Sequence, residues 1–208
     1  MQQTFLRPLY DFAMLLSLIA TMIGCSGAPA PPDKRLTEPN YRYLPSADLS
    51  SQTISTVAKD FSVRIPNHWI EMIDDKNAPN LLLWIMKEDY SASISFSPVV
   101  MDPALYKALL RDGLKSVANV SLSMKKDRVK NAFQLIVPME KFSIQEKEFY
   151  AYEYSHDGGK TITRVVVFDS GQRFIECAML PMKNSFTLEQ IKELCATQQG
   201  VIASIVKP

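Results

Sequence analysis

Alternating polar and apolar positions along the chain predict a series of β-strands. Between residues 91 and 97, serine occupies every odd position, and Ala92, Ile94 and Phe96 lie between the serines. Because successive side chains of a strand point to opposite faces, this segment predicts a half-buried strand with one serine face. The run from Leu81 to Met86 is apolar throughout, which is typical of a strand covered on both faces. Similar patterns predict further strands at residues 61–65, 121–126, 133–137, 149–154, 162–168 and 174–180.

Two other segments have helical periodicity and clear start signals. Asp102 suits an N-cap, and Pro103 suits the first turn, where its missing N–H costs least. The apolar stripe predicted for this helix comprises Tyr106, Leu109, Leu110, Leu114 and Val117. Near the C-terminus, Thr187 and Gln190 have the spacing of a capping box, which predicts a final helix.

Turn sequences separate the last three predicted strands. Asp157-Gly158-Gly159 and Asp169-Ser170-Gly171 both suit tight connections between neighbouring strands. The strands from residue 149 to residue 180 are therefore expected to form an antiparallel meander. Together with the two helices, this order of elements predicts an α+β fold built on an antiparallel sheet.

The N-terminal segment has the features of a secretory signal. Arg7 supplies a positive charge, and an uncharged apolar run extends from Phe12 to Gly24. As a helix this run is about 20 Å long, short of the roughly 30 Å hydrocarbon core that a permanent span must cross. Met22-Ile23-Gly24-Cys25 resembles the lipobox of bacterial lipoproteins, in which the cysteine is lipidated and the signal is removed. An ordinary signal peptide or a buried helix that contains a cysteine is the alternative.

The lipobox resemblance implies a particular organisation and location. Residues 1–24 are expected to be the signal peptide, and Cys25 the lipidated residue that anchors the mature protein to a membrane. Residues 25–48 are expected to form an extended proline-rich tether, with prolines at positions 29, 31, 32, 39 and 45. Residues 49–208 are expected to form one α/β domain. Ser26 stands where an Asp often marks retention in the inner membrane, which favours the outer membrane, with the domain facing the periplasm.

Charge and motif content exclude several classes of function. The chain has 23 Lys and Arg against 22 Asp and Glu, a balance that argues against nucleic-acid binding. The cationic cluster Lys125-Lys126-Asp127-Arg128 with Lys130 predicts a solvated turn, and a headgroup-binding patch is the alternative. The sequence lacks serine-hydrolase, phosphate-loop and dinucleotide motifs, and its two histidines, His68 and His156, lie far apart. We therefore expect no catalytic residues, no metal site and no cofactor.

Two cysteines remain besides Cys25. Cys177 lies on one face of the strand predicted at 174–180, and Cys195 lies on the apolar stripe of the last helix. If that stripe packs on that strand face, the two thiols can meet, and an oxidising compartment permits a disulfide. Two buried thiols are an equally good interpretation.

Aromatic residues suggest a candidate ligand groove. Tyr150, Tyr152 and Tyr154 occupy one face of a strand, Trp69 follows the strand predicted at 61–65, and Trp84 lies within the run from Leu81 to Met86. Such residues can hold a small apolar or aromatic ligand between the sheet and a helix. A tyrosine row is also common as sheet-packing surface, because aromatic residues pair well across strands.

At the level of the whole domain, the sequence resembles the PsbP-like group of proteins. The resemblance rests on Phe61-x-Val63-x-Ile65-Pro66-x-x-Trp69, the order of strands and helices, and a terminal helix that ends in Ile-x-Ser-Ile. The group includes small bacterial lipoproteins of the DcrB type. The resemblance covers about residues 55–206 and implies an antiparallel sheet sandwiched by helices and a non-catalytic accessory or assembly role.

These observations give two hypotheses for function. The first is an envelope lipoprotein, anchored through Cys25, that binds or stabilises another envelope protein. The second is a carrier of a small apolar or aromatic ligand in the cell envelope.

Overall fold

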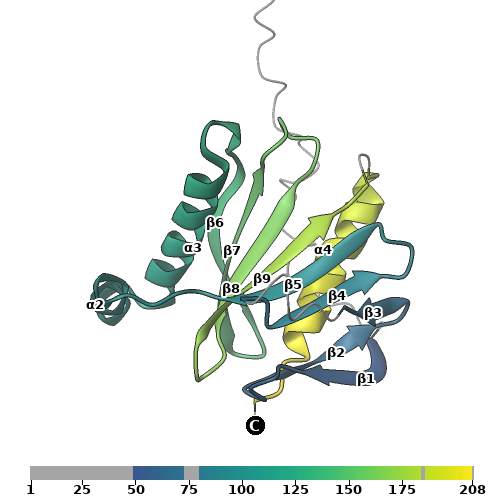
Figure 1. Cartoon of the computed structure of the whole chain (residues 1–208), viewed down its shortest axis with the longest axis horizontal. Coiled ribbons are helices and arrows are strands. Elements are labelled where there is room, and N and C mark those ends of the chain that lie inside the picture. The colour runs from purple at the N-terminus through teal and green to yellow at the C-terminus, as the bar shows by residue number, and fades with distance from the viewer. Residues whose placement is uncertain (1–48, 73–79, 184–185, 208) are drawn as a thin grey trace, which may run out of the picture. The chain divides into compact units, whose positions relative to one another are not determined.

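A seven-stranded antiparallel sheet forms the centre of the domain, and helices cover both of its faces (Figure 1). The computed structural model describes residues 49–72, 80–183 and 186–207. In spatial order the strands are β3 (Trp69–Glu71), β4 (Leu83–Lys87), β5 (Ala92–Pro98), β9 (Phe174–Pro181), β8 (Thr163–Asp169), β7 (Lys147–Ser155) and β6 (Gln134–Ile144). All neighbouring strands are antiparallel, as the sequence predicted.

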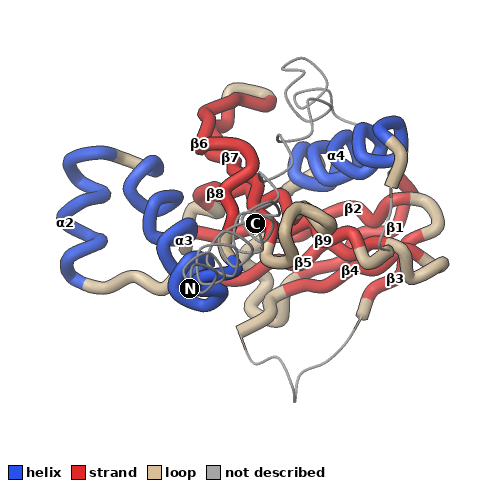
Figure 2. The backbone as a smooth tube through the Cα atoms, turned by 90° about the horizontal axis from the view of Figure 1, so that it is seen from above, coloured by secondary structure: helices blue, strands red, loops and turns tan. Residues whose placement is uncertain are grey.

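The helices lie on opposite faces of this sheet. α4 (Leu188–Ala203) covers one face, and α2 (Pro103–Asp112) and α3 (Leu114–Val129) lie on the other side (Figure 2). A short 3₁₀ turn, η3 (Lys130–Ala132), leads from α3 into β6. The predicted α+β sandwich is therefore confirmed.

Alternation along β9 shows how the sheet serves two cores. Ile175, Cys177 and Met179 face the core beneath α4, whereas Phe174 and Ala178 pack on the side of α3. The core beneath α4 also holds a ring cluster in which Phe61 lies 5.7 Å from Phe96, measured between ring centroids. β8 is thus buried on both faces, whereas β9 is fully buried only on the α4 side. This burial stabilises the sheet by removing apolar surface from water.

A small second sheet closes the α4 side of the domain. β1 (Leu49–Ser55) pairs antiparallel with β2 (Ser62–Pro66). Backbone hydrogen bonds of 3.0 Å join Ser62 and Val206 in both directions, so the end of the chain is fixed to β2. Ser204 adds a bond, because its hydroxyl accepts from the backbone N–H of Arg64 at 2.9 Å. The segment from Ser204 to Val206 therefore holds this hairpin against the end of α4.

Both predicted helix starts are present. The Asp102 carboxylate accepts a hydrogen bond from the backbone N–H of Leu105 at 2.7 Å. Thr187 and Gln190 form the reciprocal bonds of a capping box at the start of α4. Each cap satisfies N–H groups that the first turn of a helix leaves without partners.

The strand predicted at residues 121–126 is wrong, because these residues belong to α3. A helix was not recognised here because the buried face of α3 includes Ser116, Ser121 and Lys125 beside Val117 and Ala118. The helix predicted from Asp102 onwards also ends earlier than expected. Gly113, with φ of 63°, separates α2 from α3 and leaves Leu110 73% exposed.

A buried charged cluster lies between the sheet and α4. The side chains of Arg164 on β8 and Glu153 on β7 are 1% and 3% exposed, and Arg164 Nε lies 3.8 Å from Glu153 Oε1. Arg164 also donates a hydrogen bond of 2.6 Å to Gln198 on α4 and lies 5.6 Å from the centre of the Phe142 ring. The amide of Gln198 in turn donates to the Cys177 carbonyl at 3.0 Å. This cluster links four strands, β6 to β9, to the helix that covers them.

Replacing Arg164 by Met is expected to lower the free energy of unfolding by about 3–5 kcal/mol, because a buried carboxylate loses its cation. The double variant Arg164→Met/Glu153→Leu is expected to recover much of this loss, since it removes both charges. Urea unfolding of the full chain and both variants measures the difference. A single variant as stable as the parent would contradict the stabilising role of this pair.

Candidate functional site

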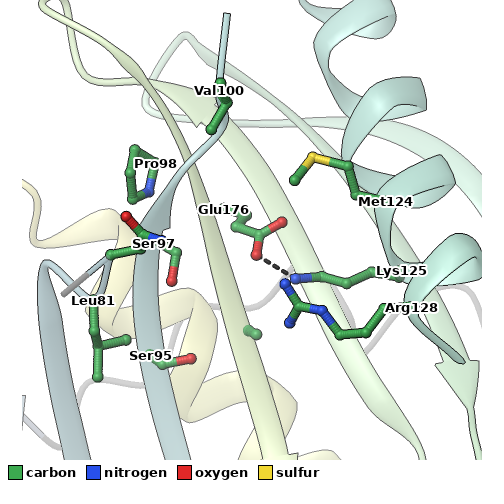
Figure 3. Close-up of a pocket in the computed structure, with 11 residues that line it drawn as sticks. Leu81, Ser95, Ser97, Pro98, Val100, Met124, Lys125, Arg128 and Glu176 are labelled. Carbon is green, nitrogen blue, oxygen red and sulfur yellow. Dashed lines mark hydrogen bonds and ion pairs between the residues drawn. The ribbon is translucent and has the colours of Figure 1, made fainter. Parts of the chain in front are cut away.

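A concave site lies between α3 and β5, above β9 (Figure 3). We call it the α3–β5 pocket, and its volume is about 400 Å³. α3 packs over β7 and β8 and covers the same face of β9 only in part. The pocket is lined by Asn80, Leu81, Ser95, Ser97, Pro98, Val100, Met124, Lys125, Arg128, Glu176 and Ala178.

Small side chains on two adjacent strands create the space. Ser95 pairs in register with Ala178, and Ser97 pairs with Glu176. These four residues lie on one face of the sheet because side chains alternate along each strand. Serine and alanine do not fill the volume that larger residues occupy elsewhere on the sheet. The serine face predicted from the sequence therefore forms one wall of the pocket.

An ion pair between Lys125 and Glu176 forms the charged floor of the pocket. Their side chains are only 11% and 13% exposed. Ser121 donates a hydrogen bond of 2.8 Å to the other carboxylate oxygen, Glu176 Oε2, and the Tyr152 hydroxyl lies 2.8 Å from Ser121 Oγ. Both oxygens of the carboxylate are thus held by donors from α3, which fixes the position of Glu176.

The two tyrosines beneath α3 are held in their neutral form. Burial is the main cause that raises the pKa of Tyr152 above its usual value, and the nearby charge of Glu176 adds to it. Burial likewise raises the pKa of Tyr154. Ser121 is completely buried and reaches no ligand directly. Ser121, whose hydroxyl also contacts Tyr152, positions Glu176. The pocket itself offers polar and charged groups suited to binding.

A second cation, Arg128, extends over the same site. It lies one helical turn after Lys125 on α3, and Figure 3 shows its side chain extending from the helix into the pocket. Unlike Lys125, Arg128 is an exposed residue. The pocket therefore has a paired charge at its floor and an open cation at its mouth.

The sequence analysis did not predict that Lys125 and Arg128 line a pocket. The cationic cluster was expected to be a solvated turn, but residues 125–128 belong to the end of α3, and Lys125 and Arg128 line the pocket. Lys126 and Lys130 are exposed, in keeping with the solvated part of that prediction. The spacing of three between residues 125 and 128, which places both on one helical face, was the available signal.

The five aromatic residues of the predicted groove do not come together. Trp69 belongs to the core beneath α4, whereas Tyr150, Tyr152 and Tyr154 pack on the opposite side of the sheet, beneath α3. Trp84 pairs with Ser95 on the neighbouring strand. None of the five lines the α3–β5 pocket. The tyrosine row has the alternative role of sheet-packing surface, and α3 covers it because the segment thought to be a strand is a helix.

Cys177 and Cys195 lie in the same core beneath α4, where the sequence placed them. Both are buried, and the structure joins them by no disulfide. The pairing of these two cysteines stays a prediction, which a thiol count tests. Burial raises the pKa of the Cys177 thiol to about 12.

Other predicted features add no further site within the described ranges. His68 lies in the turn before β3, where its Nδ1 is 3.4 Å from Glu88 Oε2, and His156 lies in the turn after β7. Among residues 49–72, 80–183 and 186–207, no three His, Cys, Asp or Glu side chains are grouped closely enough to hold a metal ion.

No helix in these ranges is long and apolar enough to span a membrane. Residues 1–24, Cys25 and the tether to residue 48 lie outside the described residues.

The sheet order, with one helix layer on each face, defines a PsbP-like fold. The solution structure of cyanobacterial PsbP (CyanoP) from Synechocystis sp. PCC 6803 matches with a TM-score of 0.52 and 17% identity, over 76% of this chain and 92% of that chain. A crystal structure from Bacteroides thetaiotaomicron has a TM-score of 0.36 and 12% identity, over 76% of this chain and 48% of that chain. The similarity to CyanoP establishes the fold alone. No protein-family profile and no curated protein matches the sequence.

Replacing Glu176 by Gln is expected to lower the free energy of unfolding by about 2 kcal/mol, because Lys125 and Ser121 lose a charged acceptor in a largely buried site. Glu148→Gln is the matched control, since Glu148 pairs with Lys141 on the exposed surface and is expected to cost less. Urea unfolding of the two variants measures the difference. Equal losses would argue against Glu176 as a fixed floor of the pocket.

The thiols of Cys177 and Cys195 are expected to be unreactive in the folded protein at pH 8, because both are buried and the Cys177 pKa is about 12. The measurement is a thiol count with a chromogenic disulfide reagent on the Cys25→Ala variant. Two thiols are expected in guanidinium without reductant, and none before unfolding. A count of zero in guanidinium would instead demonstrate the disulfide.

Proposed function

We propose that this protein is a membrane-anchored envelope lipoprotein whose domain acts as a non-catalytic binding or assembly module for another envelope protein. The observation that carries the proposal is the α3–β5 pocket. Its lining offers polar groups for contact with a partner, whereas its carboxylate, Glu176, is already bound by residues of α3. Lys125 and Ser121 occupy both oxygens of Glu176, so this carboxylate is poorly placed to act as a general base.

The proposed anchor follows from the N-terminal sequence. Cys25 follows an apolar run that is short for a permanent span, and its surroundings resemble a lipobox of the kind found in DcrB-type lipoproteins. Two or more acyl chains hold a protein stably at a membrane. The prolines between residues 29 and 45 would then keep the domain clear of that membrane, facing the periplasm.

A second candidate function is a carrier of a small ligand in the envelope. The pocket volume of about 400 Å³ supports it, because small-molecule sites commonly measure about 300–1,000 Å³. The binding-module and carrier functions differ in what occupies the pocket, a protein surface or a small molecule.

Replacing Cys25 by Ala is expected to move the protein from the membrane fraction to the soluble fraction, because the acyl anchor is lost. Affinity purification of the tagged chain from detergent-solubilised envelope, with mass spectrometry, should recover a stoichiometric partner that the Cys25→Ala variant loses. Ser26→Asp is the control, because it keeps the lipid and is expected to shift the protein from the outer to the inner membrane on a density gradient.

Two results would contradict the proposal. A Cys25→Ala variant that stays with the membranes would overturn the lipid anchor. Absence of a partner from both samples would overturn the assembly role and favour the carrier function.

A further inference from the structure

The α3–β5 pocket carries one more positive charge than negative. Lys125 and Arg128 provide two cations, and Glu176 provides the single carboxylate. Lys125 forms an ion pair with Glu176, whereas none of the residues that the structure describes forms an ion pair with Arg128. Two neighbouring cations repel each other, and an additional anion near them lowers the electrostatic energy of both. The charge of the pocket therefore favours a ligand with one negative charge.

The geometry of Arg128 suits a carboxylate in particular. Its guanidinium faces the pocket from α3, as Figure 3 shows, and the exposure of this residue leaves its N–H groups accessible. A planar guanidinium can donate two parallel hydrogen bonds to one carboxylate. Because Lys125 holds Glu176 at the floor, the pocket's own carboxylate is already engaged.

Hydroxyl groups form the opposite wall. Ser95 and Ser97 extend from β5 into the pocket, and within the described ranges neither hydroxyl has a hydrogen-bond partner. Each serine can donate one hydrogen bond and accept others. This wall therefore suits a polar substituent of a ligand that Arg128 holds by its acid group.

The remaining lining is apolar. Leu81, Val100 and Met124 surround the charged groups, and Val100 is 66% exposed. Contact with an apolar ligand body would remove these side chains from water. A bare inorganic anion would leave this surface uncovered.

We propose that the α3–β5 pocket binds a small organic acid, with its carboxylate on Arg128 and its apolar body against Val100 and Met124. This assignment deepens the carrier function proposed above, because it names the class of ligand. The charge excess, the accessible guanidinium, the open serine hydroxyls and the apolar rim all belong to one pocket.

Isothermal titration calorimetry of the detergent-solubilised full chain tests the assignment, with micelles alone as the blank. The probes are 3-phenylpropionate, its uncharged analogue 3-phenylpropionamide, and inorganic phosphate. Saturable binding at millimolar concentration is expected for the acid, with the amide and phosphate each weaker by about tenfold, because each lacks one of the two contacts.

Two variants locate the binding. Arg128→Gln is expected to weaken binding of the acid by about tenfold, and it should fold normally because Arg128 is exposed. Lys126→Gln is the matched control, since Lys126 is an exposed cation on the same helix that does not line the pocket. It removes the same charge and is expected to leave binding unchanged.

The outcomes separate this inference from the function on which it rests. If the amide binds as tightly as the acid, or if Arg128→Gln binds normally, the carboxylate assignment is overturned while the carrier function stands. If phosphate binds as tightly as the acid, the apolar contact is overturned. If neither organic probe binds, both the assignment and the carrier function are overturned.

Discussion

The pairing of β5 with β9 determines how the whole sheet is assembled. These two strands join the sheet's N-terminal part, β3 to β5, to its C-terminal part, β6 to β9, through seven paired positions from Ala92 to Pro98. The pairing spans a segment that contains two helices and three strands. Because side chains alternate, this one register decides which residues of both strands face α4 and which face α3. A shift by one residue would place Glu176 in the apolar core.

The strands were largely predictable because their patterns are local. The serine alternation before Pro98 and the apolar runs of β4 and β8 each show in a few neighbouring residues, and the turn sequences between β7, β8 and β9 reinforce them. α3 was not predictable in the same way. Its buried face carries Ser121 and Lys125, whose partners Tyr152 and Glu176 come from strands far along the chain. A search for hydrophobic periodicity does not detect a helix face that is buried through polar contacts.

The candidate site shows the same division between local and long-range information. The serine face of β5 and the position of Arg128 one turn after Lys125 are both present in the sequence, yet nothing local indicates that they face each other. Their meeting depends on α3 lying over β7 and β8 and covering β9 only in part. The aromatic residues, which stand out in the sequence, are placed instead by packing, with Tyr152 completely buried. The aromatic residues therefore predicted the position of the pocket less well than the small serines of β5 did.

The fixed position of Glu176 has a consequence for how the pocket responds to its occupant. Its backbone belongs to the central strand, the adjacent Cys177 side chain lies in the opposite core, and its carboxylate is bound from α3. A floor held in this way is preorganised, so little conformational entropy remains to be lost when the pocket is filled. Selectivity should then come from rigid complementarity of shape and charge rather than from induced fit. An occupant that binds only the folded state would also raise the melting temperature of the whole domain.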